Sequence, residues 1–181
     1  LNKCNEAIAY SLKVLEAEQK DNSIQNEAHL IAARCAIKSE DLTTAQKEFS
    51  VLAKQGNSAI TAEAKYSLAL IQFKLSNYKD SQKRCFEIIK ELPSYDFWIA
   101  KSFILLAENY YALKDNFQAK QTLQSIIANY EKSVDDTEDI KTIAQQKLDV
   151  IISSEKETSN KELLQRQQLN SSENDSLEIG N

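Results

Sequence analysis

Residues that form tight turns are almost missing from this sequence. Its 181 residues include two glycines, Gly56 and Gly180, and a single proline, Pro93, so β-hairpins have almost no residues to form their turns. No apolar run approaches the roughly 18 residues that a membrane-spanning helix needs, and no signal peptide is recognisable. Methionine is absent and the sequence begins with leucine, so we expect a processed chain or a segment of a longer protein. The scarcity of turn residues predicts an all-helical fold.

Residues that commonly carry catalysis or bind metals are also few. His29 is the only histidine, which excludes histidine-rich metal sites and most Ser-His or Cys-His arrangements within this chain. The three cysteines, Cys4, Cys35 and Cys85, lack a Cys-x-x-Cys spacing, so we expect neither a disulfide framework nor a zinc site. We interpret His29, Cys35 and Cys85 as packing residues. The sequence predicts no catalytic residue, no cofactor and no metal.

The charge balance argues against nucleic acid as a partner. Lysine and arginine number 22 against 27 acidic residues, which gives a formal net charge of −5 and no basic surface for phosphates. An acidic cluster at 135–139 lacks the alternating ligands, central glycine and distal glutamate of a calcium loop. We interpret this cluster as a cap for the last helix, because acidic side chains complement a helix N-terminus.

A pattern written three times, at intervals of 36 to 38 residues, is the main feature that the sequence does contain. In each copy a turn precedes a small residue, which is Ala45, Ser81 and Ala119 in order along the chain. A fourth, incomplete copy with Ala7 opens the sequence. A fixed period of this length is typical of helical pairs stacked into a solenoid.

Apolar residues at three- and four-residue spacing predict where the helices lie. We expect helices at 5–19, 25–38, 43–54, 59–75, 79–91, 97–113, 117–132 and 138–154. Pro93 ends one of them, and Gly56 is predicted to adopt a left-handed cap at the end of another. The expected organisation is the second helix of a truncated repeat (1–20), repeats at 21–57, 58–94 and 95–133, a capping helix at 134–156, and a polar, partly disordered tail at 157–181.

The copies resemble the tetratricopeptide repeat family over about residues 1–152. The third copy carries the motif most fully, with Phe103, Leu106, Ala107, Tyr110, Asp115 and Ala119. The second supplies Leu68, Ala69, Phe73 and Pro93 but departs at Ser81 and Cys85, and the first is nearest in Ala45 and Phe49. The resemblance implies a right-handed superhelical solenoid of about three repeats plus a leading half-repeat and a capping helix. It also implies a concave face built from the first helix of each pair.

Residues 93–111 are similar to repeats of bacterial envelope proteins, such as outer-membrane assembly lipoproteins and cell-division coordinators. That similarity favours the periplasmic side of the cell envelope over the cytoplasm. A groove that clamps chaperone tails is not predicted, because Arg34, Leu70 and Glu108 stand where the asparagines of such clamps are expected.

By analogy with the family, side chains of the three first helices line a partner-binding groove. The expected residues are Glu27, Leu30, Arg34, Ile37, Lys38, Glu63, Tyr66, Leu70, Phe73, Lys74, Lys101, Ile104, Glu108 and Tyr111. Apolar side chains flanked by both charge signs suit an extended peptide or a partner helix. Any one of these residues taken alone is better explained by packing, whereas the surface as a whole favours binding.

The leading hypothesis is a non-enzymatic scaffold that binds another protein or peptide and forms the C-terminal part of a longer repeat protein. In it, helix 5–19 leaves an apolar stripe of Ile8, Leu12 and Leu15 uncovered, so a longer chain carrying the preceding helix is expected to be more stable. The alternative is a regulatory repeat domain of a larger enzyme or signalling protein whose catalytic part lies upstream. Two further hypotheses are self-association and a tail that folds back into the groove through Leu163, Leu164 and Leu169.

Overall fold

The computed structural model describes residues 2–17, 21–56, 58–132 and 136–178, with helices and no strand in these ranges. The eight helices are α1 (Asn2–Glu16), α2 (Asn22–Lys38), α3 (Leu42–Leu52), α4 (Ala59–Lys74), α5 (Tyr78–Glu91), α6 (Asp96–Ala112), α7 (Asn116–Asn129) and α8 (Ile140–Glu178). The first seven begin and end within three residues of their predicted positions, except that the predicted end of the first helix falls outside the described residues.

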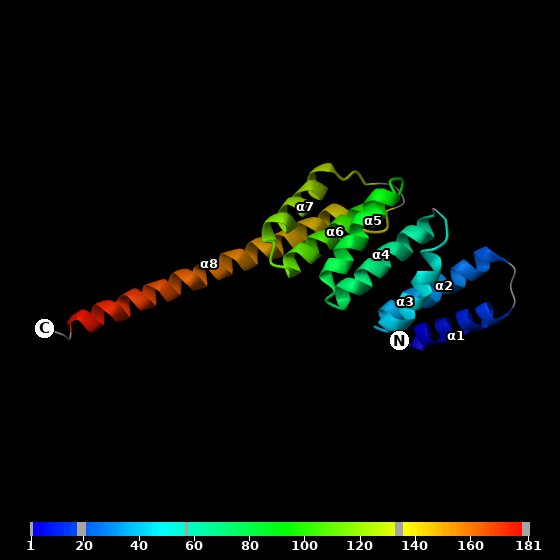
Figure 1. The fold of residues 1–181 in the computed structure, drawn as a ribbon, viewed down its shortest axis with the longest axis horizontal. Coiled ribbons are helices and arrows are strands. Elements are labelled where there is room, and N and C mark those ends of the chain that lie inside the picture. The colour runs from blue at the N-terminus through cyan, green and yellow to red at the C-terminus, as the bar shows by residue number, and fades with distance from the viewer. Residues whose placement is uncertain (1, 18–20, 57, 133–135, 179–181) are drawn as a thin grey trace.

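The helices stack in chain order as antiparallel pairs (Figure 1). Each helix packs on the next one in the sequence, and α6 also contacts both α4 and α8. The pairs are α2–α3, α4–α5 and α6–α7, preceded by α1 and followed by α8. The predicted all-helical solenoid of paired helices is therefore confirmed.

One non-glycine residue in left-handed conformation marks the turn inside each pair. Glu40, Ser76 and Lys114 have φ values of 60°, 61° and 67°, and they recur with the period of the repeats. The prediction that Gly56 supplies a left-handed cap is wrong, since no described glycine has a positive φ and Ala53, the residue that caps α3, has right-handed helical geometry. The left-handed residue is needed where the chain reverses within a pair, and the sequence has no glycine there.

The residue after each left-handed position closes one helix and starts the next. Asp41, Asn77 and Asp115 each donate their backbone N–H to the carbonyl oxygen five residues earlier, at 2.9 Å in all three turns. The carboxylates of Asp41 and Asp115 then accept the backbone N–H of the residue three positions later, at 3.0 and 3.1 Å. The three turns thus share one backbone geometry, whereas the side-chain cap is made only by Asp41 and Asp115.

The core consists of three clusters, and each cluster joins one helix pair to the first helix of the next unit. The small residues of the repeated pattern, Ala45, Ser81 and Ala119, are all 0% exposed. Their size lets neighbouring helix backbones approach closely. Phe103 on α6 packs against two of the clusters, so the core continues from pair to pair.

Ser81 departs from the usual alanine because it takes part in a buried polar contact. The Nδ2 atom of Asn109 on α6 donates to the Ser81 hydroxyl oxygen on α5 at 2.9 Å, and to the Leu105 carbonyl oxygen at 2.8 Å. Both Ser81 and Asn109 are 0% exposed. A hydrogen bond in such a dry environment fixes the register of α6 against α5.

The last helix does not end at about residue 154, where the sequence predicted its end, but continues to Glu178. Its first four turns bury Ile140, Ala144, Leu148 and Ile151 against the preceding pair. The remainder projects away from the body (Figure 1), and every side chain from 156 to 168 is exposed.

The sequence of α8 explains why it continues without tertiary support. Residues 140–178 contain neither glycine nor proline, and glutamate, lysine, glutamine and leucine are good helix formers. Two acid–base pairs with favourable i,i+4 order, Glu157 with Lys161 and Glu162 with Arg166, add local support.

Residues 156–168 of α8 do not fold back over α2, α4 and α6 in this structure (Figure 1). Leu163 and Leu164 lie on the projecting part of α8 and are each 57% exposed, whereas the side chain of Leu169 is outside the described residues. The hypothesis of a tail folded back into the groove is therefore not supported. At the other end of the solenoid, Leu12 is 41% exposed, as expected for an uncovered stripe, but Ile8 and Leu15 are half-buried.

Candidate partner-binding surface

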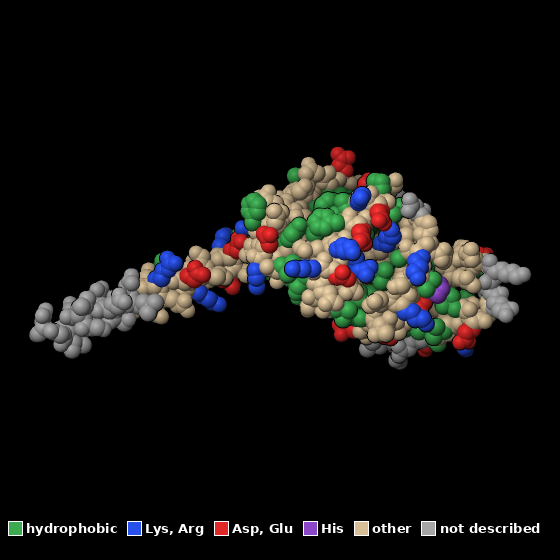
Figure 2. Space-filling view, in the orientation of Figure 1, with side chains coloured by type: hydrophobic (Ala, Val, Ile, Leu, Met, Phe, Trp, Pro, Cys, Tyr) green, Lys and Arg blue, Asp and Glu red, His purple; other side chains and the backbone are tan. Residues whose placement is uncertain are grey.

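The first helices α2, α4 and α6 carry all fourteen residues predicted to line the groove. Leu30 and Ile104 are buried in the core, at 4% and 6% exposure, so these two are not available to a partner. Four others are exposed, namely Glu27, Arg34, Lys38 and Lys74. The remaining eight are half-buried: Ile37, Glu63, Tyr66, Leu70, Phe73, Lys101, Glu108 and Tyr111. Figure 2 shows apolar side chains interspersed with charges of both signs over the visible face of the body.

Arg34 and Glu63 connect the first helices of two successive pairs. The Nε and Nη2 atoms of Arg34 donate to the two carboxylate oxygens of Glu63, both at 2.6 Å. This bidentate geometry is the strongest form of ion pair for arginine, and the hydrogen bond to Glu63 raises the pKa of the Arg34 guanidinium. The pair fixes α2 relative to α4.

An aromatic cluster surrounds Lys101 and connects α4 with α6. The rings of Tyr66 and Trp98 are 5.5 Å apart between centroids. The Lys101 Nζ atom lies 5.1 Å from the Tyr66 centroid and 5.4 Å from those of Phe97 and Trp98, within range of cation–π attraction. It also donates to a carboxylate oxygen of Glu138 at 2.5 Å. Burial raises the pKa of the Tyr66 phenol, so the ring stays neutral beside the ammonium group.

A small apolar pocket of about 280 Å³ lies between α6 and α8. It is lined by Ala107, Glu108, Tyr111, Leu123, Gln146, Lys147, Val150 and Ile151. Leu123 on α7 completes its lining. Glu108 and Lys147 form an ion pair at its edge, and Val150 is 60% exposed although it is apolar. Such a pocket suits one aliphatic or aromatic side chain.

Sequence reasoning placed Glu108 and Tyr111 at this surface but missed Lys147 and Val150. The signal for Val150 was present in the pattern of α8. The buried stripe runs through Ile140, Ala144, Leu148 and Ile151, and Val150 is an apolar residue outside that stripe. An apolar residue on the polar side of an amphipathic helix indicates a surface with another use.

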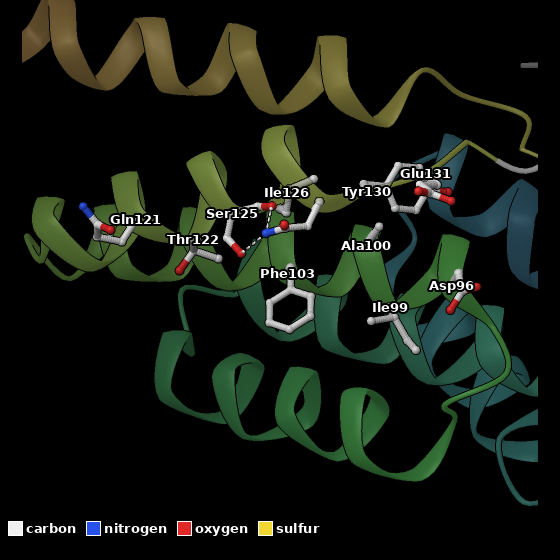
Figure 3. Close-up of a pocket in the computed structure, with 11 residues that line it drawn as sticks. Asp96, Ile99, Ala100, Phe103, Gln121, Thr122, Ser125, Ile126, Tyr130 and Glu131 are labelled. Atoms are coloured by element: carbon white, nitrogen blue, oxygen red, sulfur yellow. Dashed lines mark hydrogen bonds between the residues drawn. The ribbon is translucent and has the colours of Figure 1, made fainter.

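A second, larger cavity of about 630 Å³ lies between α6 and α7 (Figure 3). It contains none of the predicted groove residues. Its apolar part is formed by Ile99, Phe103 and Ile126, and the Nδ2 atom of Asn129 donates to the carbonyl and hydroxyl oxygens of Ser125 at 3.0 and 3.3 Å. No motif in the sequence indicated this cavity.

His29 has a structural partner inside its own pair. Its Nδ1 atom lies 2.6 Å from a carboxylate oxygen of Glu48 on α3, and the Glu48 side chain is only 3% exposed. The contact joins α2 to α3 and gives the buried carboxylate a partner, in agreement with a packing role. Within the described ranges, no group of histidine, cysteine, aspartate and glutamate side chains is arranged to hold a metal ion.

Helical pairs that share one core and repeat one turn define a helical-repeat solenoid. Residues 97–133, which cover α6 from its second residue and all of α7, match the family model described as tetratricopeptide repeat. A comparison with curated proteins finds no match. The turns of α2–α3 and α4–α5 have a left-handed residue at the position equivalent to Lys114 of the matched pair. Repeats of this family suggest a scaffold for protein–protein interaction.

Among the described residues, no helix combines the length and the apolar content needed to cross a bilayer.

Proposed function

We propose that this chain is a non-catalytic scaffold that binds an extended peptide or a partner helix along the face formed by α2, α4, α6 and α8. The observation that carries the proposal is the apolar pocket between α6 and α8, with exposed Val150 in its wall and the Glu108–Lys147 ion pair at its edge. The pocket takes an apolar anchor of the partner, and the ion pair offers hydrogen bonds to the polar atoms beside that anchor.

Rigidity of the surface supports the same function. The Arg34–Glu63 pair connects α2 with α4, and the aromatic cluster around Lys101 adds side-chain contacts to the direct packing of α6 on α4. A surface that is already ordered loses little conformational entropy when a partner binds. The half-buried side chains of Leu70, Phe73 and Tyr111 then add apolar contact area along the partner.

The test uses peptides selected from a random library on the immobilised chain. We expect Val150→Lys to lower the affinity for the selected peptides at least tenfold, because the ammonium group would occupy or border an apolar pocket. Val51→Lys is the matched control, since Val51 is also an exposed valine (36%) but lies on α3, the second helix of its pair. Fluorescence anisotropy gives both affinities. Equal affinities for the two variants would show that peptides bind elsewhere.

A location on the periplasmic side of a bacterial envelope is part of the proposal. Its motivation is the resemblance of residues 93–111 to repeats of envelope proteins, a finer assignment than the tetratricopeptide repeat match of residues 97–133. Cell fractionation with an antibody against the chain tests it, because a protein found only in the cytoplasmic fraction would remove this part of the proposal while leaving the binding surface unaffected.

A further inference from the structure

Two of the three cysteines lie opposite one another in the first helical hairpin. α1 ends at Glu16 and α2 begins at Asn22, and the two helices pack side by side (Figure 1). In such a hairpin, residues at equal distance from the connection face each other. Cys4 stands 12 residues before the end of α1, and Cys35 stands 13 residues after the start of α2. Both side chains are half-buried and both thiols are free.

The electrostatics of Cys35 agree with this placement. Burial raises the pKa of the Cys35 thiol, and the neighbouring Cys4 thiol raises it further, whereas Lys38 lowers it. The two sulfur atoms are therefore close enough to influence each other. Cys85 differs, because it is 0% exposed in the core cluster between α4, α5 and α6, where burial raises the pKa of its thiol to about 12.

We propose that Cys4 and Cys35 form an oxidisable pair that closes to a disulfide between α1 and α2. The oxidant is a peroxide. One thiolate attacks a peroxide oxygen, which yields a sulfenic acid and, for hydrogen peroxide, one water molecule. The second thiol then attacks the sulfenic sulfur, forms the S–S bond and releases a second water. The two thiols lose two protons and two electrons, and the peroxide gains them.

The position of the pair gives the bond a structural consequence. α1 contacts α2, and its other side is open to solvent, as the exposure of Tyr10 (68%) and Leu12 (41%) shows. A helix packed on one side opens more easily than a helix packed between two neighbours. A disulfide to Cys35 prevents α1 from separating from α2, so oxidation stabilises the α1–α2 hairpin selectively.

Peptide mapping of the full chain tests the proposal directly. The native protein is treated with hydrogen peroxide, alkylated without reduction and digested with trypsin. Cleavage after Lys3 and Arg34 places the two thiols in peptides 4–13 and 35–38, and Cys85 in peptide 85–90. We expect peptides 4–13 and 35–38 to appear joined, with a mass about 2 Da below their sum. Reduction with dithiothreitol is expected to separate them, and Cys85 should be alkylated only after unfolding.

Hydrogen exchange gives the second readout. Oxidation should slow amide exchange throughout α1 by tenfold or more, and Cys4→Ser should abolish both the joined peptide and this protection. Cys85→Ser is the matched control and should retain both. The proposal is overturned if native protein yields no joined peptide, if Cys4 is oxidised alone to sulfinic acid, or if the bond forms between two copies of the chain.

Discussion

Replacement of Glu40 and Lys114 by glycine is expected to stabilise the fold. Both residues hold a left-handed backbone, with φ values of 60° and 67°, although each carries a Cβ atom. That conformation costs a non-glycine residue about 1–2 kcal/mol. Glycine removes this cost but gives the unfolded chain more freedom, which offsets about 0.4–1 kcal/mol. The net gain is therefore about 0.5–1 kcal/mol at each site, and both side chains are exposed, so little contact is lost.

Thermal and guanidinium unfolding measure the effect. For a chain of this size, 1 kcal/mol shifts the melting temperature by about 2–4 °C, and the two sites are far enough apart for their effects to add. The double variant should thus melt about 2–8 °C higher than the parent chain. Ser76→Gly should gain less, because the Ser76 hydroxyl oxygen accepts a hydrogen bond from the Tyr78 hydroxyl at 3.4 Å.

Alanine at the same two sites is the control. Glu40→Ala and Lys114→Ala remove the side chains but keep the Cβ atom, so the left-handed strain remains. If alanine stabilises as much as glycine, the side-chain charge and not the backbone is responsible. If glycine destabilises, the turns are not strained, and the explanation of the shared turn geometry is wrong.

Two further predictions concern a buried contact and the docking of the last helix. Ser81→Ala should cost about 1 kcal/mol in urea unfolding, because the Asn109 amide loses a buried acceptor, and should cost almost nothing when Asn109 is already alanine. The Lys120 ammonium and the Asn116 amide hold the pKa of Glu155 below its ordinary value, so the stabilisation is present at neutral pH and is lost as the pH falls through the folded pKa. Glu155→Gln should therefore reduce the drop in melting temperature between about pH 6 and about pH 3, whereas an unchanged drop would contradict this reasoning.

The helix positions could be predicted because the packing imposes a period on the sequence. Two helices approach closely only where a small residue stands, so Ala45, Ser81 and Ala119 mark equivalent points of the three pairs. The positions of the turns follow from these residues, because a turn precedes the small residue in each copy. The identity of the left-handed residues could not be predicted in the same way, because glutamate, serine and lysine carry no signal for that conformation. A left-handed conformation was predicted for Gly56 only because glycine is the residue that most often adopts it.

The length of α8 was missed for a related reason. Apolar periodicity marks only buried residues, and the apolar burial of α8 stops at Ile151 and Ile152. Helix formation beyond that point depends on local propensity and on charge pairs four residues apart, which leave no apolar stripe. The sequence therefore indicated where packing ends but not where the helix ends.

The contacts among groove residues could not be predicted from the repeat. Arg34 and Glu63 are 29 residues apart, and nothing in the period requires them to meet. Lys101 was expected to face a partner but instead lies against Tyr66 on the neighbouring first helix α4 and against Trp98 on its own helix. Such pairs depend on the rotation between successive units, which the sequence period does not specify.

These internal pairs determine which substitutions can report on binding. Arg34, Lys101 and Glu108 each have an ion-pair partner in the solenoid itself, so changing them alters the angle between first helices as well as the surface charge. A loss of binding in such variants would have two explanations. Val150 has no comparable role, because it is exposed and outside the buried stripe of α8. A lysine at this position changes the pocket without changing the solenoid. Substitutions in the apolar wall therefore distinguish a binding surface from a surface that only holds the helices together, whereas substitutions of the charged residues do not.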